Sequence, residues 1–175
     1  AGGGVTYINS EIDRLTKNHK QTMRIRKLRE DAFFESLEAG EVDLKPFTTE
    51  ILNFIKERNI KIGLASSTYG EKAKKVLEYF KLLEYFDFMV FGDEVEHLKP
   101  APDIYLEVVK RCKEDIDSIL VFEDSVSGVT AAKSAGLTGI IHVPDSSVKN
   151  SQVQLHTFAR VKDFSEGIEI IKRIG

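Results

Sequence analysis

The chain has a single cysteine, Cys112, no long apolar run and almost balanced charge over its 175 residues. One cysteine excludes a disulfide within the chain and fits a reducing compartment. The 25 basic and 28 acidic side chains leave a net charge of −3, which argues against a broad positive surface for nucleic acid. No apolar stretch approaches the roughly 20 residues of a membrane-spanning helix. We therefore expect a cytoplasmic monomer with no nucleic-acid or membrane partner.

Several familiar sites are also absent from the sequence. The glycines at 2–4 are not followed by Lys and Ser or Thr, so they do not form a P-loop. No Gly-x-Gly-x-x-Gly motif follows an expected strand, and the four histidines lack the spacing of a zinc site. Cys112 lies on an apolar helix face, where packing explains it better than nucleophilic chemistry.

The first part of the chain, residues 1–44, carries helical patterns. Ser10 and Asp13 have the spacing of a helix start, and Ala39-Gly40 has the composition of a helix stop. Basic side chains occupy the positions between the apolar ones, which is typical of a solvated helix face. We predict a partial helical domain at 1–44 and an α/β core at 45–175.

Within the α/β core, apolar runs of strand length alternate with helical patterns. The expected strands are 61–66, 88–91, 119–122 and 140–143, with a short edge strand starting at Val161 and a last helix through 168–174. Pro100 and Pro102 suit the first turn of the helix before the third strand. Because the strand runs are apolar without alternation, we expect a parallel sheet that is covered by helices on both faces.

Polar residues follow three consecutive strands of this expected sheet. They are Ser66-Ser67-Thr68 after the first, Lys99 after the second and Glu123-Asp124 after the third. Ligands of an open parallel sheet bind beyond the carboxyl ends of its strands, so we expect these groups to converge there. Taken singly, they could be a turn, a surface lysine and a solvated loop. Taken together, they favour a binding site.

The residue types at this edge suit a phosphate and a divalent cation. Ser66 and Ser67 can donate hydrogen bonds to phosphate oxygens, and the ammonium of Lys99 can act as a point charge on them. Adjacent carboxylates at Glu123 and Asp124 repel each other unless a cation lies between them. Ligands that are all oxygen favour magnesium over zinc.

These residues stand in three strings that resemble the later motifs of the haloacid dehalogenase (HAD) superfamily. The strings are Leu-Ala-Ser-Ser at 64–67, Lys-Pro-Ala-Pro-Asp at 99–103 and Phe-Glu-Asp-Ser at 122–125. Their order and spacing are similar to those of the branch that contains β-phosphoglucomutase. The resemblance covers residues 45–145 well and the helical start more loosely. It implies a Rossmann-like core with a helical cap, to which residues 1–44 would belong.

The resemblance also implies a role for each matching residue. Ser66 would hold the transferring phosphoryl group, and Lys99 would balance the charge between this group and the nucleophile. Glu123 and Asp124 would hold Mg²⁺. Asp103 would stabilise the start of its helix.

This sequence departs from the family pattern in its first motif. The family begins with a strand that ends in Asp-x-Asp, where the first aspartate is the nucleophile, and no such motif precedes residue 45. Three explanations are open. The sequence omits an amino-terminal segment, which we favour, or the chain pairs with another chain, or it is a relative without turnover.

The resulting hypothesis is a magnesium-dependent phosphatase for a small phosphorylated metabolite, such as a sugar phosphate, that works through an aspartyl-phosphate intermediate. A phosphomutase of the β-phosphoglucomutase type is the first alternative. A non-enzymatic phosphate-binding or receiver-like module and an inactive fragment are the others. Receivers place their acidic pair first in the chain and their lysine last, which is the reverse of the order here.

Overall fold

A computed structural model describes residues 19–144 and 157–175 of the chain. The chain divides into two compact units, one containing Lys45–Gly175 and the other spanning Gly3–Leu44. In the smaller unit, the helix α2 (His19–Glu38) ends just before Gly40, whose φ of 73° lies in the left-handed region. A helix stop at this glycine was expected and is confirmed. The predicted helix start at Ser10 and Asp13 lies outside the described residues.

The larger unit alternates strands and helices. Its α-helices are α3 (Thr48–Lys56), α4 (Gly70–Tyr79), α5 (Asp103–Cys112), α6 (Val126–Ser134) and α7 (Phe164–Ile174). Its strands are β1 (Gly63–Ser66), β2 (Phe88–Phe91), β3 (Leu120–Glu123), β4 (Gly139–His142) and β5 (Ala159–Arg160). Three short 3₁₀ helices, η1 (Leu83–Tyr85), η2 (Gly92–Glu94) and η3 (Ile116–Ser118), lie in the connections. The predicted α/β class is confirmed.

Two boundaries differ from the sequence-based expectation. The helix α5 begins at Asp103, so Pro100 and Pro102 precede it and do not form its first turn. The edge strand β5 ends at Arg160, one residue before the expected start at Val161. Residue propensities do not determine the residue at which a helix or strand ends, so boundaries predicted from sequence shift by one or two residues.

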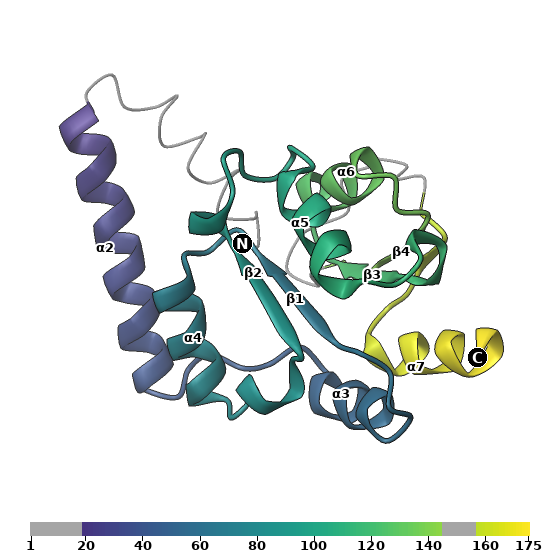
Figure 1. Cartoon of the computed structure of the whole chain (residues 1–175). Coiled ribbons are helices and arrows are strands. Elements are labelled where there is room, and N and C mark those ends of the chain that lie inside the picture. Colours follow the sequence, from purple (N-terminus) through teal and green to yellow (C-terminus); the bar gives the residue numbers. More distant parts are fainter. Residues whose placement is uncertain (1–18, 145–156) are drawn as a thin grey trace. The chain divides into compact units, whose positions relative to one another are not determined.

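The strands form two parallel sheets where the sequence suggested one. β1 pairs with β2, while β4 lies between β3 and β5 (Figure 1). In these registers Ser66 stands opposite Phe91 and Glu123 stands opposite His142. Ser66 and Glu123 are therefore the last residues of their strands. Within the described ranges, β1 and β3 are not paired with each other.

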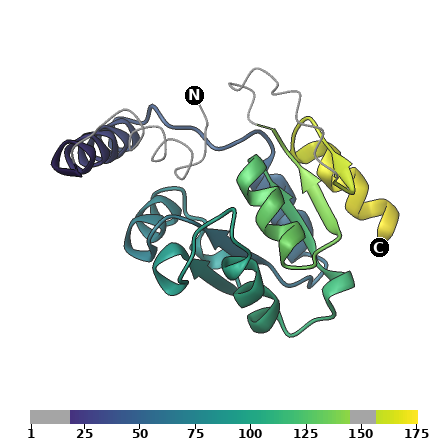
Figure 2. The same ribbon diagram turned by 90° about the horizontal axis from the view of Figure 1, so that it is seen from above.

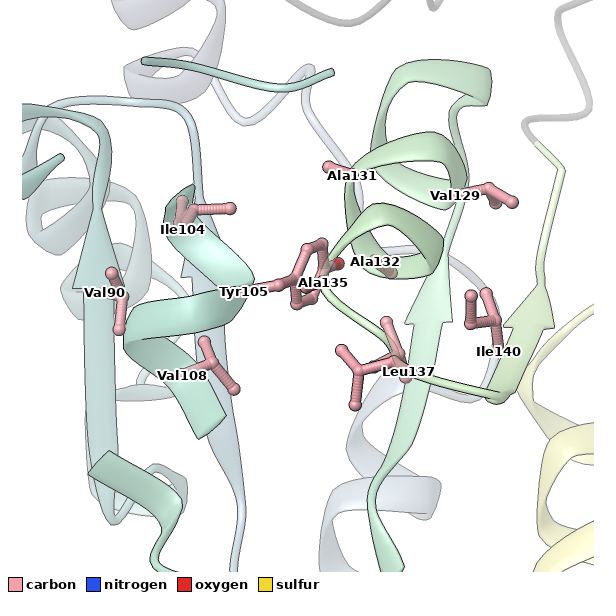
Figure 3. Packing of buried hydrophobic residues seen from close by; sticks show 11 residues of the cluster. Val90, Ile104, Tyr105, Val108, Val129, Ala131, Ala132, Ala135, Leu137 and Ile140 are labelled. Carbon is pink, nitrogen blue, oxygen red and sulfur yellow. The ribbon is translucent and has the colours of Figure 1, made fainter. Parts of the chain in front are cut away.

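One apolar core nevertheless spans both sheets. Val90 of β2 and Val121 of β3 belong to the same buried cluster, together with side chains of α5 and α6 (Figure 3). Side chains alternate along a strand, so Phe122 points the other way and packs against Phe164 of α7. By the same alternation, Glu123 lies on the face of Val121, towards α5.

The other face is covered by α3 and α7, which pack side by side (Figure 1). Gly167 of α7 lies so close to the sheet that an added Cβ would be 2.7 Å from the Phe122 ring and 3.4 Å from Ile51 of α3. β5 and α7 lie next to β4 at one edge of the unit (Figure 2). Helices therefore cover both faces, as predicted. None of the described helices combines the length and apolarity needed to cross a bilayer.

We expect Ile104→Ala to lower the free energy of unfolding by about 2–5 kcal/mol, because the substitution leaves a cavity in this core. Ile104 is 0% exposed. Leu106 of the same helix is 52% exposed, so Leu106→Ala is the control and should change stability by no more than about 0.5 kcal/mol. Urea denaturation followed by circular dichroism measures both, and equal losses would contradict this account of the core.

Candidate active site

Lys99 is a buried lysine at the carboxyl ends of the strands, with 8% of its surface exposed. Its Nζ donates to the backbone carbonyl of Ala65 in β1 at 3.2 Å. The same Nζ donates to the Oε1 atom of Glu123, which ends β3 and is 7% exposed. Buried charges are stable only when they are paired and hydrogen-bonded. This lysine therefore connects two strands that do not pair with each other.

Tyr105 completes the group around the Glu123 carboxylate. Its hydroxyl donates to the same Oε1 atom that Lys99 contacts. The Lys99 Nζ also lies 3.4 Å from this hydroxyl and 4.9 Å from the centre of the tyrosine ring. Burial and the neighbouring charge of Glu123 raise the pKa of Tyr105 well above its ordinary value. The phenol therefore keeps its proton and acts as a donor to the carboxylate.

The start of α6 confines Glu123 from the other side. Ser125 caps this helix, since its Oγ accepts the N–H of Gly128 at 3.0 Å. The same Oγ lies 3.4 Å from Oε2 of Glu123. A Cβ at Gly128 would overlap the Glu123 carboxylate, so only glycine leaves room for it there. These contacts fix the position of the acidic side chain.

Asp124 differs from its neighbour Glu123 because about half of its side chain, 51%, is exposed. The Nζ of Lys45 lies 3.9 Å from Oδ2 of Asp124. Partial burial and the charge of Glu123 raise the pKa of Asp124, and the charges of Lys45 and Lys99 oppose this shift. Because half of the side chain is exposed, the Asp124 carboxylate is accessible to solvent.

The loops after β1 and β2 are joined to each other at the same edge. The N–H of Thr68 donates to Oγ of Ser66 at 3.2 Å, and the Thr68 carbonyl accepts the N–H of Gly92 at 3.2 Å. Gly70, the first residue of α4, donates its N–H to Asp93 at 2.8 Å. Gly92 also packs closely on the Ser67 carbonyl, where a Cβ would not fit. The serine loop is thus held in one conformation.

Asp103 anchors the loop that carries Lys99. It is the first residue of α5, and its Oδ1 accepts the backbone N–H of His97 at 3.1 Å. The ring Nδ1 of His97 also lies 3.1 Å from this oxygen, and this contact lowers the pKa of Asp103. Asp103 thus ties the preceding connection to the first residue of α5, and its predicted role in stabilising the helix start stays a prediction.

The comparison with known proteins gives the family. Residues 5–141 match the family of haloacid dehalogenase-like hydrolases. The chain belongs to this family. Over 135 residues it is 41% identical to the phosphorylated carbohydrates phosphatase of Thermotoga maritima, which covers 75% of this chain and 59% of that relative. The chain therefore spans about three fifths of the length of this curated relative.

Solved structures of the same superfamily share the fold of this HAD-like chain. A candidate β-phosphoglucomutase from Thermotoga maritima superposes with a TM-score of 0.71 at 35% identity, covering 89% of this chain and 68% of that one. CbbY from Rhodobacter sphaeroides in complex with phosphate superposes with a TM-score of 0.72 at 25% identity, covering 83% and 65%. The resemblance to the HAD superfamily and to its β-phosphoglucomutase-like branch is confirmed.

The structure of this HAD-like chain adds two residues that the sequence did not single out. Tyr105 follows Lys99 by six positions. A tyrosine on an apolar helix face needs a hydrogen-bond partner for its hydroxyl, so the sequence held a signal for this residue. Lys45 carries no such signal, because it is remote in sequence from Asp124. The described residues include no group of three or more His, Cys, Asp or Glu side chains able to hold a metal.

We expect Lys99→Met to lower the free energy of unfolding by about 3–5 kcal/mol, because Glu123 would lose its buried charge partner. The matched control is Lys110→Met, since Lys110 is also paired with a glutamate, Glu107, at 3.1 Å, but its side chain is 77% exposed. Loss of this surface pair should cost about 0–1 kcal/mol. Urea denaturation compares the two variants, and a small effect of Lys99→Met would show that the pair adds little to stability.

Proposed function

We propose that this HAD-like chain forms the phosphoryl-transfer core of a magnesium-dependent phosphatase for a small phosphorylated carbohydrate. The observation that carries the proposal is the buried ammonium of Lys99 at the carboxyl ends of β1 and β3. Its Nζ contacts the carbonyl of Ala65, the residue before the serine loop, and the carboxylate of Glu123, the residue before Asp124. The related phosphatase of Thermotoga maritima supports the class of substrate. Family membership favours such an enzyme over a receiver-like module.

Three groups of the chain would bind the phosphoryl group. Ser66 and Ser67 would supply hydroxyl and backbone donors from the loop that the Thr68 contacts hold in place. Lys99 would place a positive charge beside the phosphate oxygens. Donors and charges that are fixed before the reaction stabilise the developing charge without reorganisation. The hydrogen bond to the Ala65 carbonyl keeps the Lys99 ammonium at the strand end, next to Ser66.

Asp124 and Glu123 would hold Mg²⁺, and the donors present fit this ion. Asp124 has a half-exposed carboxylate, and within the described residues the hydrogen bond of Oε2 of Glu123 is the long one of 3.4 Å with Ser125. Mg²⁺ commonly takes one or two carboxylates and completes its six ligands with water and substrate phosphate. Bound there, the ion would neutralise charge on the phosphoryl oxygens. The described part of the chain offers no third acidic or histidine ligand to this site.

The nucleophile would come from a strand between β1 and β3. These strands share one core but do not pair with each other in the described ranges. A buried strand edge normally has a partner for its backbone groups. A strand that ends in Asp-x-Asp would bring an aspartate close to the Lys99 ammonium, and this aspartate would accept the phosphoryl group. The unit containing α2 would belong to the cap domain, as the resemblance to the family implies.

A phosphomutase is the second candidate, because a candidate β-phosphoglucomutase is among the similar structures at 35% identity. The two activities share the binding of the phosphoryl group and differ in its final acceptor. Incubation with glucose phosphates separates them. A phosphatase releases inorganic phosphate, and a mutase moves the phosphoryl group between sugar hydroxyls.

We expect Asp124→Ala and Lys99→Ala each to reduce turnover by about 100-fold or more, since each removes a charge that stabilises the transition state. The measurement is phosphate release from a panel of sugar phosphates with Mg²⁺, by protein that carries its complete amino-terminal region.

The matched control is Asp117→Ala, because Asp117 is an exposed aspartate in η3, before β3, outside the proposed site. This variant should keep wild-type turnover. Unchanged turnover in either site variant would refute the proposed assignment. Binding of phosphate without any turnover in the wild-type protein would favour the inactive alternative.

A further inference from the structure

Oε1 of Glu123 accepts from two donors, which fill both of its lone-pair sites. Lys99 and Tyr105 both donate to it. Glu123 is 7% exposed, so water has little access to replace a donor that leaves. A buried carboxylate that loses all its donors costs several kcal/mol. The Tyr105 hydroxyl therefore remains as a donor to Oε1 when Lys99 moves away.

Under the proposed function, a bound phosphate competes with Glu123 for the Lys99 ammonium. In the structure the Lys99 Nζ contacts the Glu123 carboxylate, the Tyr105 hydroxyl and the Ala65 carbonyl. When a phosphoryl group binds, the same ammonium must direct an N–H towards the phosphate oxygens. An ammonium has three donors, and all three are already used by these contacts. Binding of the anion therefore requires the lysine to release one of these three acceptors, and Glu123 is one of them.

We infer that Tyr105 is a positioning residue whose hydroxyl keeps Glu123 hydrogen-bonded while Lys99 turns towards the phosphate. This inference rests on the proposed phosphate-binding role of Lys99. The geometry suits it, because the Tyr105 hydroxyl can donate to Oε1 and still accept from the lysine at 3.4 Å. The hydroxyl therefore stays hydrogen-bonded to Glu123 when the lysine turns away, so Oε1 keeps a donor.

A purely structural role for Tyr105 is the competing explanation. Its ring belongs to the apolar cluster between α5 and α6 (Figure 3) and is 3% exposed. Phenylalanine would keep this packing and remove only the hydroxyl. Tyr105→Phe therefore separates the two roles, because packing alone predicts no specific effect on anion binding.

The first test is calorimetric titration of the chain with inorganic phosphate. We expect Tyr105→Phe to weaken phosphate binding about fivefold, which corresponds to one lost hydrogen bond. Tyr79→Phe is the matched control, since Tyr79 is 44% exposed at the end of α4, and it should bind as the wild type does.

The second test is a thermal unfolding cycle that needs no ligand. Lys99→Met removes the first donor, so among the described residues Tyr105 remains as the donor to Oε1. We expect Tyr105→Phe to lower the unfolding midpoint more in the Lys99→Met background than in the wild type. If the double variant does not fold, the phosphate titration of Tyr105→Phe decides alone.

The outcomes separate this inference from the proposed function. Wild-type affinity for phosphate in Tyr105→Phe, together with additive midpoints, would overturn the positioning role and leave the phosphate site intact. Lack of phosphate binding by the wild type, or unchanged binding in Lys99→Ala, would overturn the phosphate site and the inference with it. Weaker binding with non-additive midpoints supports both.

Discussion

The buried ion pair between Lys99 and Glu123 is the interaction on which the arrangement of the site depends. The lysine comes from the loop before α5 and the glutamate from the end of β3, and the lysine also reaches the Ala65 carbonyl of β1. Burial makes each charge dependent on the other, because neither has water to replace its partner. The pair therefore fixes the distance between two strands that no backbone hydrogen bond connects in the described residues.

The alternation of side chains along β3 gives the two adjacent carboxylates different environments. Glu123 lies on the face of Val121, where α5 and α6 surround it, and it has a tyrosine and a lysine as donors. Asp124 follows the last residue of the strand and keeps half of its side chain exposed. Adjacent acidic residues thus differ in exposure. Glu123 is held inside the protein through Oε1, and Asp124 reaches the solvent.

Family, fold class and most of the proposed site could be read from the sequence because each rests on local patterns. Apolar runs of strand length predicted the parallel strands, and three short strings carried the resemblance to the HAD superfamily. The division into two sheets could not be read in this way. It follows from which strand edges pair, and strand propensity contains no information about partners. The two prolines suggested that α5 would begin at Pro100 or Pro102, but it begins at Asp103. Pro100 and Pro102 belong to the loop that carries Lys99.

The sequence by itself determined the order of chemical groups: the serines, then Lys99, then the acidic pair, each at the end of a strand or in the connection that follows it. Parallel strands bring such groups to one edge whatever the rest of the chain does. Only the tertiary structure decided which groups touch. Tyr105 meets Glu123, and Lys45 approaches Asp124, because helix packing and chain path bring residues far apart in sequence within a few ångströms. Contacts of this kind depend on the whole packed core, and no local pattern encodes them.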